Sequence, residues 1–336
     1  FPFMDDSFDD PIPSSVIAEG TDFWNGAGDR GDAAMYLYGA SRYALTCGNL
    51  GGSRELWNAI LWCAGYCLSR KNESGVILSD SDELEGRLPS GKANLCTNML
   101  TLGGLRYASR IAAAIGDTAN AARFLGEARA LEIACEKYFA ANIRGFDTYR
   151  YYEGNTTLRS WICMPLCVDV YDHADGTVDA ITSAYLMSDA GQLSEEGAEI
   201  AWDRSTLYGI RGMFRAGKNS AAWSYLQDYC SRRLIGRHVP YPVEAWPEGG
   251  MRHLSAESAL FCQIVTEGIL AIDPLSFGSF SFVPKLPYGM EHLVLSNIHA
   301  FGQTFSITVD HDGWSVKTAS GKTYSGTSTE RQTIEF

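Results

Sequence analysis

Residues 93–139, ANLCTNMLTLGGLRYASRIAAAIGDTANAARFLGEARALEIACEKYF, carry the clearest helical pattern of the chain. Apolar residues recur three and four positions apart over 93–115 and again over 119–139, which is the spacing of helices with a buried face. Gly116 and Asp117 interrupt the pattern, and these residue types are typical of the end of one helix and the start of the next. The stretch therefore predicts two long helices joined by a short turn.

The same periodicity extends in both directions from this helical hairpin. It predicts nine helices in total, and the other seven cover residues 33–47, 54–70, 158–171, 178–187, 204–216, 220–234 and 255–272. The turns within pairs of helices are short, whereas the connections between pairs are longer and carry acidic and aromatic residues. This alternation is typical of a ring or solenoid of helical hairpins whose long loops form one functional face.

After Ile272 the pattern changes to a period of two. Apolar and polar residues alternate in TFSITVDHDGWSVKTASGKTYSG, residues 304–326, with Asp-Gly and Ser-Gly pairs as turns. We therefore expect a small antiparallel β module. The first residues are rich in Asp, Pro, Gly and Ser. The expected organisation is a linker over 1–29, a helical domain over 30–273 and a β module over 274–336.

The composition argues against several classes of partner. Lys and Arg number 27 and Asp and Glu number 40, so the formal net charge is −13. No basic run offsets this charge, which argues against binding to a nucleic acid, an anionic membrane or a polyanionic glycan. No stretch reaches the roughly 18 uninterrupted apolar residues of a membrane span.

Cysteines and known motifs give little support for a metal or a cofactor. Cys63 and Cys67 are four residues apart among apolar neighbours, as are Cys163 and Cys167, which favours buried free thiols over a metal or redox site. Ca²⁺ at the acidic residues 80–82 is the remaining metal alternative, but the glycine spacing of an EF-hand is missing. Nucleotide-binding, zinc-protease and serine-hydrolase motifs are also missing. We expect neither metal nor cofactor.

Two stretches resemble the (α/α)6-barrel glycosidases, the six-hairpin superfamily that includes glucoamylases and bacterial α-L-rhamnosidases. In SDSDELEGRLPSGKANLCTNMLTLGGLRYASRIAAAIGD, residues 79–117, an acidic loop precedes a long helix that leads to an Ile-Gly-Asp turn. PYPVEAWPEGGMRHLSAESALFCQIVTEGILAIDPLSFGSFSFVPKLP, residues 240–287, resembles the end of such a barrel. The resemblance implies a mainly α fold, an (α/α)6 toroid of helical hairpins, followed by the antiparallel β module.

The resemblance also bears on what precedes the chain. If the acidic loop is placed as in glucoamylases, the nine helices are the fourth to the twelfth of the ring. We therefore expect this chain to be the C-terminal part of a longer protein and to pack against an upstream region of roughly 100 residues or more, since six hairpins need twelve helices. The alternative is an open array of nine helices.

The acidic loop holds the candidate proton donor. The resemblance implies cleavage of a glycosidic bond, which by inversion needs a protonated carboxyl group and a carboxylate about 6.5–9.5 Å away that activates water. Aligning Gly86 with the glycine that closes the glucoamylase loop puts Asp82 and Glu83 at its two adjacent acids. We favour Glu83 as the general acid, with Asp82 second. The alternative is a solvated acidic loop, since charge runs are usually solvated.

Glu244 is the candidate general base. It lies between Pro242 and Trp246, just before the last predicted helix, where the superfamily usually carries its base. Glu248 is close enough in sequence to replace it.

Aromatic and polar residues in the long loops are the candidates for substrate binding. Aromatic faces pack on the C–H faces of sugar rings, while charged and amide side chains bond to sugar hydroxyls. For each residue alone, a structural salt bridge or helix cap is the alternative. The candidates are Trp24, Arg30, Asp32, Glu85, Arg87, Tyr152, Glu153, Asp203, Arg204, Tyr241, Trp246, Glu248, Arg252 and His253.

Three functions are compatible with these residues. The leading hypothesis is an inverting glycoside hydrolase that acts on an oligosaccharide or polysaccharide of neutral sugars. The second is a glycoside phosphorylase, although Glu244 argues against it because a phosphate pocket requires Arg, His and backbone N–H groups. The third is a sugar-binding helical scaffold without catalysis.

Overall fold

The computed structural model describes residues 29–82, 88–235, 242–246 and 255–336. The chain divides into two compact units. Unit 1 contains the described parts of 1–45, 49–140 and 150–155, and unit 2 contains those of 46–48, 141–149 and 156–336. The linker, helical domain and β module expected from the sequence are a different division of the chain, and they stay a prediction.

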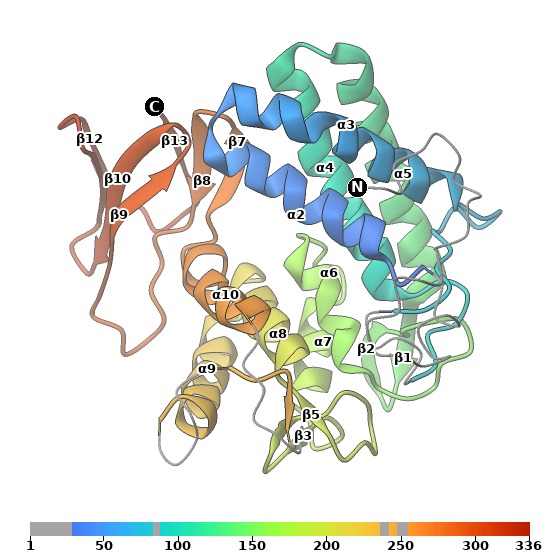
Figure 1. The fold of residues 1–336 in the computed structure, drawn as a ribbon. Coiled ribbons are helices and arrows are strands. Elements are labelled where there is room, and N and C mark those ends of the chain that lie inside the picture. Colours follow the sequence, from blue (N-terminus) through green and yellow to red (C-terminus); the bar gives the residue numbers. More distant parts are fainter. Residues whose placement is uncertain (1–28, 83–87, 236–241, 247–254) are drawn as a thin grey trace. The chain divides into compact units, whose positions relative to one another are not determined.

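Unit 1 is built around one central helix (Figure 1). Its helices are α2 (Asp32–Cys47), α3 (Leu50–Ser69), α4 (Leu95–Ile115) and α5 (Thr118–Phe139). Helix α4 packs against α3 and α5 and is buried along almost its whole length, which explains its many apolar and small residues. Gly104 of α4 faces α2, and a Cβ there would lie 2.6 Å from the Leu37 side chain. The missing side chain therefore allows the two helices to pack closely.

Polar caps fix the ends of the predicted hairpin. The Asn94 side chain accepts a hydrogen bond from the backbone N–H of Thr97 at 2.8 Å and so caps α4. Gly116 ends α4 in the left-handed region with φ 85°. Asp117 then caps α5 through the backbone N–H of Asn120. The turn predicted between the two helices is confirmed.

Unit 2 has its own central helix, α8. Its α-helices are α6 (Met164–Cys167), α7 (Ala174–Ile181), α8 (Asp203–Arg215), α9 (Asn219–Arg233) and α10 (Ser255–Gln263). A 3₁₀-helix, η2 (Ser160–Cys163), precedes α6, and a π-helical stretch, η3 (Ile264–Ile269), follows α10. Helix α8 packs against α6, α9, α10 and η3 (Figure 1). Among the described residues, each of the nine predicted helices has a counterpart.

Two of these predictions were wrong in length or position. The helix predicted over 158–171 is only the short η2–α6 segment, because Pro165 lacks an N–H and Asp169, with φ 62°, leaves the helical region. The helix predicted over 178–187 is α7, which ends at Ile181. The hydroxyls of Thr182 and Ser183 donate to carbonyls in the last turn of α7 and compete with further helical bonding.

Three short two-stranded sheets lie among the helices. They pair β1 (Ala140–Ile143) with β2 (Phe146–Tyr149), β3 (Met187–Ser188) with β4 (Gly191–Gln192), and β5 (Ala201–Trp202) with β6 (Ala245–Trp246). The first hairpin was missed, because only a loop was predicted there. Arg144 and Gly145 form its turn with φ values of 56° and 88°. Two successive residues with positive φ match the twist of a β-hairpin.

The β module of unit 2 confirms the period-two pattern after Ile272. One antiparallel sheet has the order β12-β11-β10-β9 and the other the order β13-β8-β7. Their shared core contains Phe280, Phe305, Ile307 and Val316, with Ile307 directly opposite Val316. The strands are β7 (Asp273–Ser276), β8 (Ser279–Phe282), β9 (His292–Ala300), β10 (Gln303–Asp310), β11 (Trp314–Thr318), β12 (Thr323–Gly326) and β13 (Gln332–Glu335).

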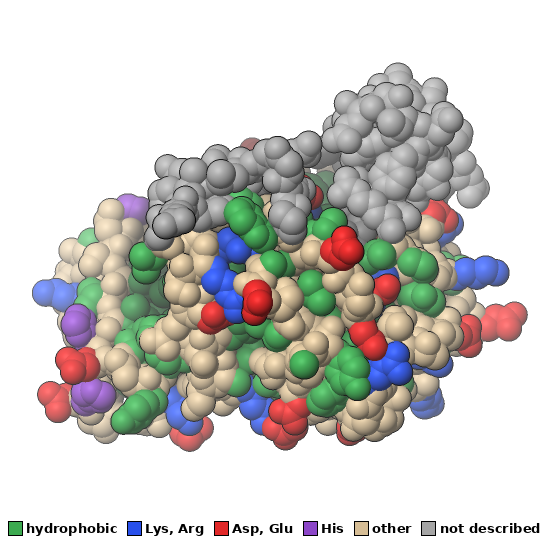
Figure 2. All heavy atoms as spheres, turned by 90° about the horizontal axis from the view of Figure 1, so that it is seen from below, with side chains coloured by type: hydrophobic (Ala, Val, Ile, Leu, Met, Phe, Trp, Pro, Cys, Tyr) green, Lys and Arg blue, Asp and Glu red, His purple; other side chains and the backbone are tan. Residues whose placement is uncertain are grey.

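The fold class is therefore mainly α with small antiparallel sheets, most of whose strand residues follow Ile272. All nine cysteines are free, and the four predicted to be buried thiols, Cys63, Cys67, Cys163 and Cys167, are buried. Within the described ranges, no helix combines the length and the apolar character needed to cross a membrane. Figure 2 shows basic and acidic side chains dispersed among other types on the face that it draws.

Candidate active site

In unit 1, a short segment before α4 holds Asp80 and Asp82, the two acids of the acidic loop that the structure describes. The backbone N–H groups of Asp80 and Ser81 both donate to the carbonyl oxygen of Asp29 at 3.0 Å. The carbonyl of Ser81 accepts from the side chain of Asn94, the cap of α4, at 3.2 Å. The chain is thereby fixed just before Asp82.

Asp82 is buried and hydrogen-bonded. The residue is only 1% exposed, and its Oδ2 accepts a hydrogen bond from the hydroxyl of Tyr151 at 2.9 Å. The carbonyl of Tyr151 in turn accepts from the backbone N–H of Leu95, at the start of α4. Glu83, Glu85 and the rest of the acidic loop to Arg87 lie outside the described residues.

Tyr152 is brought close to this segment. Its backbone forms an isolated β-bridge with Asn94, whose side chain also holds Ser81. Gly91 lies against the ring of Tyr152: a Cβ at this glycine, which has φ +68°, would lie 2.6 Å from the Tyr152 Cβ. Glu153 is exposed and accepts from the hydroxyl of Tyr138 at 3.3 Å.

A second acid near Asp82 was not predicted. Burial raises the pKa of Asp29 above its usual value, and the hydrogen bond from the backbone N–H of Gly31 only partly opposes this effect. Arg30 and Asp32 lie next to it and face each other at 3.6 Å. Their pairing at the start of α2 is the helix-end salt bridge that was the alternative to substrate binding. Trp24 lies outside the described residues.

In unit 2, the short β5–β6 pair brings two predicted segments together. Ala201 pairs with Trp246 and Trp202 pairs with Ala245. The backbone N–H of Asp203 donates to the carbonyl of Glu244 at 3.0 Å. The Asp203–Arg204 and Glu244–Trp246 segments, which are about 40 residues apart in the chain, are therefore neighbours.

Asp203 is the first residue of α8, and its carboxylate accepts hydrogen bonds from buried side chains of α9. The Nε of Arg233 donates to both carboxylate oxygens, at 2.8 and 3.1 Å, and the hydroxyl of Tyr229 donates at 3.2 Å. Burial raises the pKa of Asp203 above its usual value despite these partners. The guanidinium of Arg233 also lies 5.1 Å from the centre of the Trp246 ring, so it connects this ring to the buried acid.

Arg204 contacts two carboxylates. Its Nε donates to Oε1 of Glu257 at 2.6 Å, and its Nη2 lies 3.9 Å from Oε1 of Glu244. Glu257 is fully buried, whereas the Glu244 side chain is 20% exposed. We call Asp203, Arg204, Arg233, Glu244 and Glu257 the Arg204 cluster. Within it, the partly exposed carboxylate of Glu244 lies beside the guanidinium of Arg204.

Two residues of this cluster, Arg233 and Glu257, were missed in the sequence, as was Tyr229, which donates to Asp203. Tyr229 and Arg233 are four apart on α9, and both are buried. A polar pair on the buried face of a helix is a signal that sequence periodicity can reveal. The sequence does not mark Glu257 as a site residue, because acids are common in the first turn of a helix, where they interact favourably with the helix dipole. Tyr241, Glu248, Arg252 and His253 lie outside the described residues.

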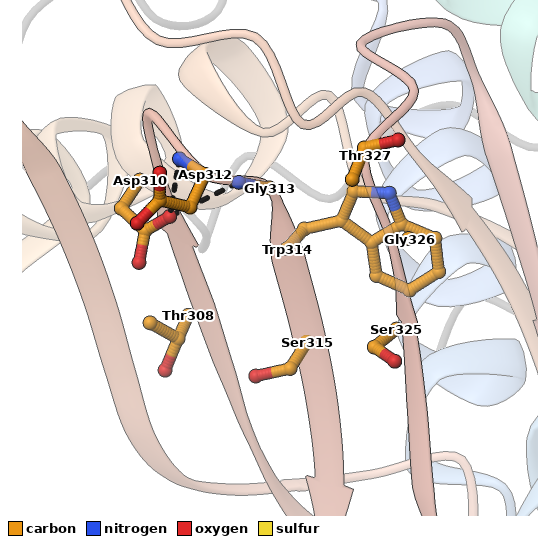
Figure 3. Close-up of a pocket in the computed structure, with 9 residues that line it drawn as sticks. All are labelled: Thr308, Asp310, Asp312, Gly313, Trp314, Ser315, Ser325, Gly326 and Thr327. Atoms are coloured by element: carbon orange, nitrogen blue, oxygen red, sulfur yellow. Dashed lines mark hydrogen bonds between the residues drawn. The ribbon is translucent and has the colours of Figure 1, made fainter.

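A groove in the β module contains none of the predicted site residues. It has a volume of about 350 Å³ and lies between β10, β11 and β12, with Thr308, Ser315 and Ser325 along it and Asp310 and Asp312 at one end (Figure 3). Within the described parts of the chain, His, Cys, Asp and Glu side chains form no group of three or more that could hold a metal ion.

Comparisons with known proteins point to the fold. No protein-family model and no curated protein matches the sequence. A solved structure titled "Sialidase" has a TM-score of 0.71 and 14% identity, over 91% of this chain and 33% of that one. The GH78 family rhamnosidase of Bacillus sp. GL1 has a TM-score of 0.54 and 16% identity, over 84% and 31% of the two chains. This chain thus spans about a third of each protein, and it shares its fold with enzymes named as glycosidases.

Proposed function

We propose that this chain belongs to a glycoside hydrolase that cleaves glycosidic bonds in a neutral glycan with inversion. The observation that carries the proposal is the Arg204 cluster, in which Glu244 is partly exposed and lies 3.9 Å from a guanidinium. A neighbouring cation favours the charged form of a carboxyl group, which is the form that a general base requires. The fold shared with named glycosidases supports this assignment.

The general acid in this proposal is Glu83. Asp82, the second candidate, is buried and already accepts a hydrogen bond from Tyr151. A proton donor must reach the oxygen of the leaving group, which argues against a buried carboxyl group such as that of Asp82. Tyr152 lies beside this segment and is the candidate for contact with a sugar ring.

The proposal includes an (α/α)6 toroid, because inversion requires the two carboxyl groups to face one pocket about 6.5–9.5 Å apart. The helical hairpins of the ring would present the segment before α4 and the Arg204 cluster at the same end. The β module over 274–336 would then lie outside the catalytic ring, and Trp246 would line the pocket.

The test is the release of free sugar from a panel of aryl glycosides. The panel includes α-L-rhamnosides and sialosides, because the structural neighbours carry these names. We expect release from a neutral glycoside in the absence of phosphate. Release that depends on phosphate would identify a phosphorylase instead. Saturable binding of a glycan without any release would identify a binding protein and contradict the proposal.

A further inference from the structure

Glu257 is a buried carboxylate with an unsatisfied oxygen. It lies in the first turn of α10 with no exposed surface, and Oε1 accepts from Arg204 Nε at 2.6 Å. Among the residues that the structure describes, no group hydrogen-bonds to the buried Oε2. A buried polar atom without a partner lowers stability, so its presence calls for an explanation other than stability.

The two carboxylates bind different parts of the Arg204 guanidinium. The short, charge-assisted bond of Glu257 occupies Nε, whereas Glu244 lies at the longer distance of 3.9 Å from Nη2. A guanidinium is planar and rigid, so a carboxylate that fixes Nε also fixes the direction of the remaining N–H groups. Glu257 thereby determines where Arg204 directs its positive charge.

We propose that Glu257 is a positioning residue that holds Arg204 against Glu244 and so keeps the carboxylate of Glu244 oriented. The inference rests on the proposed function, for which it names the residue that fixes the base. Glu257 itself has no exposed surface. Its effect on the reaction is therefore transmitted through Arg204.

The charges around Glu244 predict the effect of removing this carboxylate. Among the described residues, the cluster contains four charged groups besides Glu244. They are Asp203 and Arg204 at the start of α8, Arg233 on α9 and Glu257 on α10. Glu257→Gln removes one negative charge beside Arg204 and leaves Glu244 as the carboxylate that faces its Nη2. Glu244 should then lose its proton at lower pH. Arg204→Met removes the positive charge and should have the opposite effect.

Helix α8 offers a matched control. Arg211, two turns after Arg204, donates to Glu267 Oε2 at 2.8 Å, and Glu267 lies in η3, directly after α10. Glu267→Gln therefore removes a similar ion pair between the same two parts of the fold without touching Glu244. It separates a general loss of helix packing from an effect on the base.

The experiment is a ¹³C NMR titration of the glutamate carboxyl carbons, with the Glu244 signal assigned from its absence in Glu244→Gln. We expect the titration midpoint of Glu244 to fall by about 0.5–1.5 pH units in Glu257→Gln and to rise in Arg204→Met, as Coulomb's law requires for charges a few ångströms away. Glu267→Gln should leave it unchanged. The same midpoint in Glu257→Gln and the wild-type protein would overturn the inference.

Kinetics on a cleaved glycoside provide the second readout. We expect Glu257→Ala to lower kcat about 10- to 100-fold with KM within about twofold, because misplacing a catalytic group affects the reaction step and not the binding of substrate. Glu257→Gln, which keeps an oxygen for Arg204, should retain more activity than Glu257→Ala. A wild-type protein that cleaves no glycoside refutes the proposed function, whereas an active enzyme with unchanged kcat in both Glu257 variants refutes only the inference.

Discussion

The acids of the two units differ in their hydrogen-bond and ion-pair partners. In unit 1, Asp82 lies at the end of a loop and accepts a hydrogen bond from a tyrosine hydroxyl. In unit 2, the carboxylates of Asp203, Glu244 and Glu257 lie beside arginines of α8 and α9. A hydroxyl partner is compatible with a protonated carboxyl group, whereas a guanidinium favours the charged form.

The largest expected effect is the loss of the general base. Glu244→Gln should lower turnover by about 10²–10⁴-fold on every cleaved glycoside, because water activation is needed whatever the leaving group. Added azide should restore turnover and give a glycosyl azide of inverted configuration. Steady-state kinetics with and without azide measure this effect, with Glu267→Gln as the control. Wild-type turnover in Glu244→Gln would remove unit 2 from the catalytic site.

The loss of the general acid should depend on the leaving group. Glu83→Gln should lower turnover by about 10²–10⁴-fold on alkyl glycosides but much less on nitrophenyl glycosides, which need little protonation. Asp82→Asn is the comparison, because the burial of Asp82 predicts no such dependence on the leaving group. If Asp82→Asn shows this dependence and Glu83→Gln does not, the two acids exchange roles.

Stability should distinguish the two kinds of partner. Arg233→Met leaves the buried Asp203 without its cation and should lower the free energy of unfolding by about 3–5 kcal/mol. Tyr151→Phe removes one hydrogen bond to Asp82 and should cost about 1 kcal/mol. Urea unfolding at neutral pH measures both. Equal losses in the two variants would contradict the distinction between the units.

The stability of unit 2 should depend on pH in opposite directions through two of its acids, Asp203 and Asp169. Burial raises the pKa of Asp203, so its contribution to stability is present below the usual value of 3.8 and is lost as pH rises through the folded pKa. Burial also acts to raise the pKa of Asp169, but the Arg215 guanidinium outweighs it, and the pKa lies below 3.8. The contribution of Asp169 is present above 3.8 and is lost as pH falls through the folded pKa.

Urea unfolding between about pH 2 and pH 6 tests these opposite signs. Relative to Asp203→Asn, the wild-type protein should lose stability as pH rises. Relative to Asp169→Asn, it should lose stability as pH falls. The same direction of change in both comparisons would show that the two acids do not differ as the structure indicates.

Periodicity predicted the long helices of the fold because one-sided burial leaves a regular pattern in the sequence. Helix α4, with its Asn94 cap and Gly116 end, was predicted within two residues. The η2–α6 segment and the β1–β2 hairpin were not predicted, because the φ values of Asp169 and Arg144 depend on tertiary contacts and lie in a region that such residues rarely adopt.

The candidate site could be predicted only where its residues are close in sequence. Asp203–Arg204 and Glu244–Trp246 were singled out by residue type, but their pairing through β5 and β6 is a tertiary contact. Glu257 could not be recognised, because its burial and its bond to Arg204 exist only in the packed helices. Whether Glu83 and Glu244 face one pocket stays a prediction.

The configuration of the first sugar released distinguishes an inverting from a retaining glycosidase. Proton NMR recorded within the first minutes of hydrolysis distinguishes the α and β anomers before they interconvert. If Glu83 donates the proton and Glu244 activates water, the product has the configuration opposite to that of the glycoside. A first product that retains the configuration would contradict the assignment of Glu244 as a base that activates water, because retention requires a carboxylate that attacks the sugar itself.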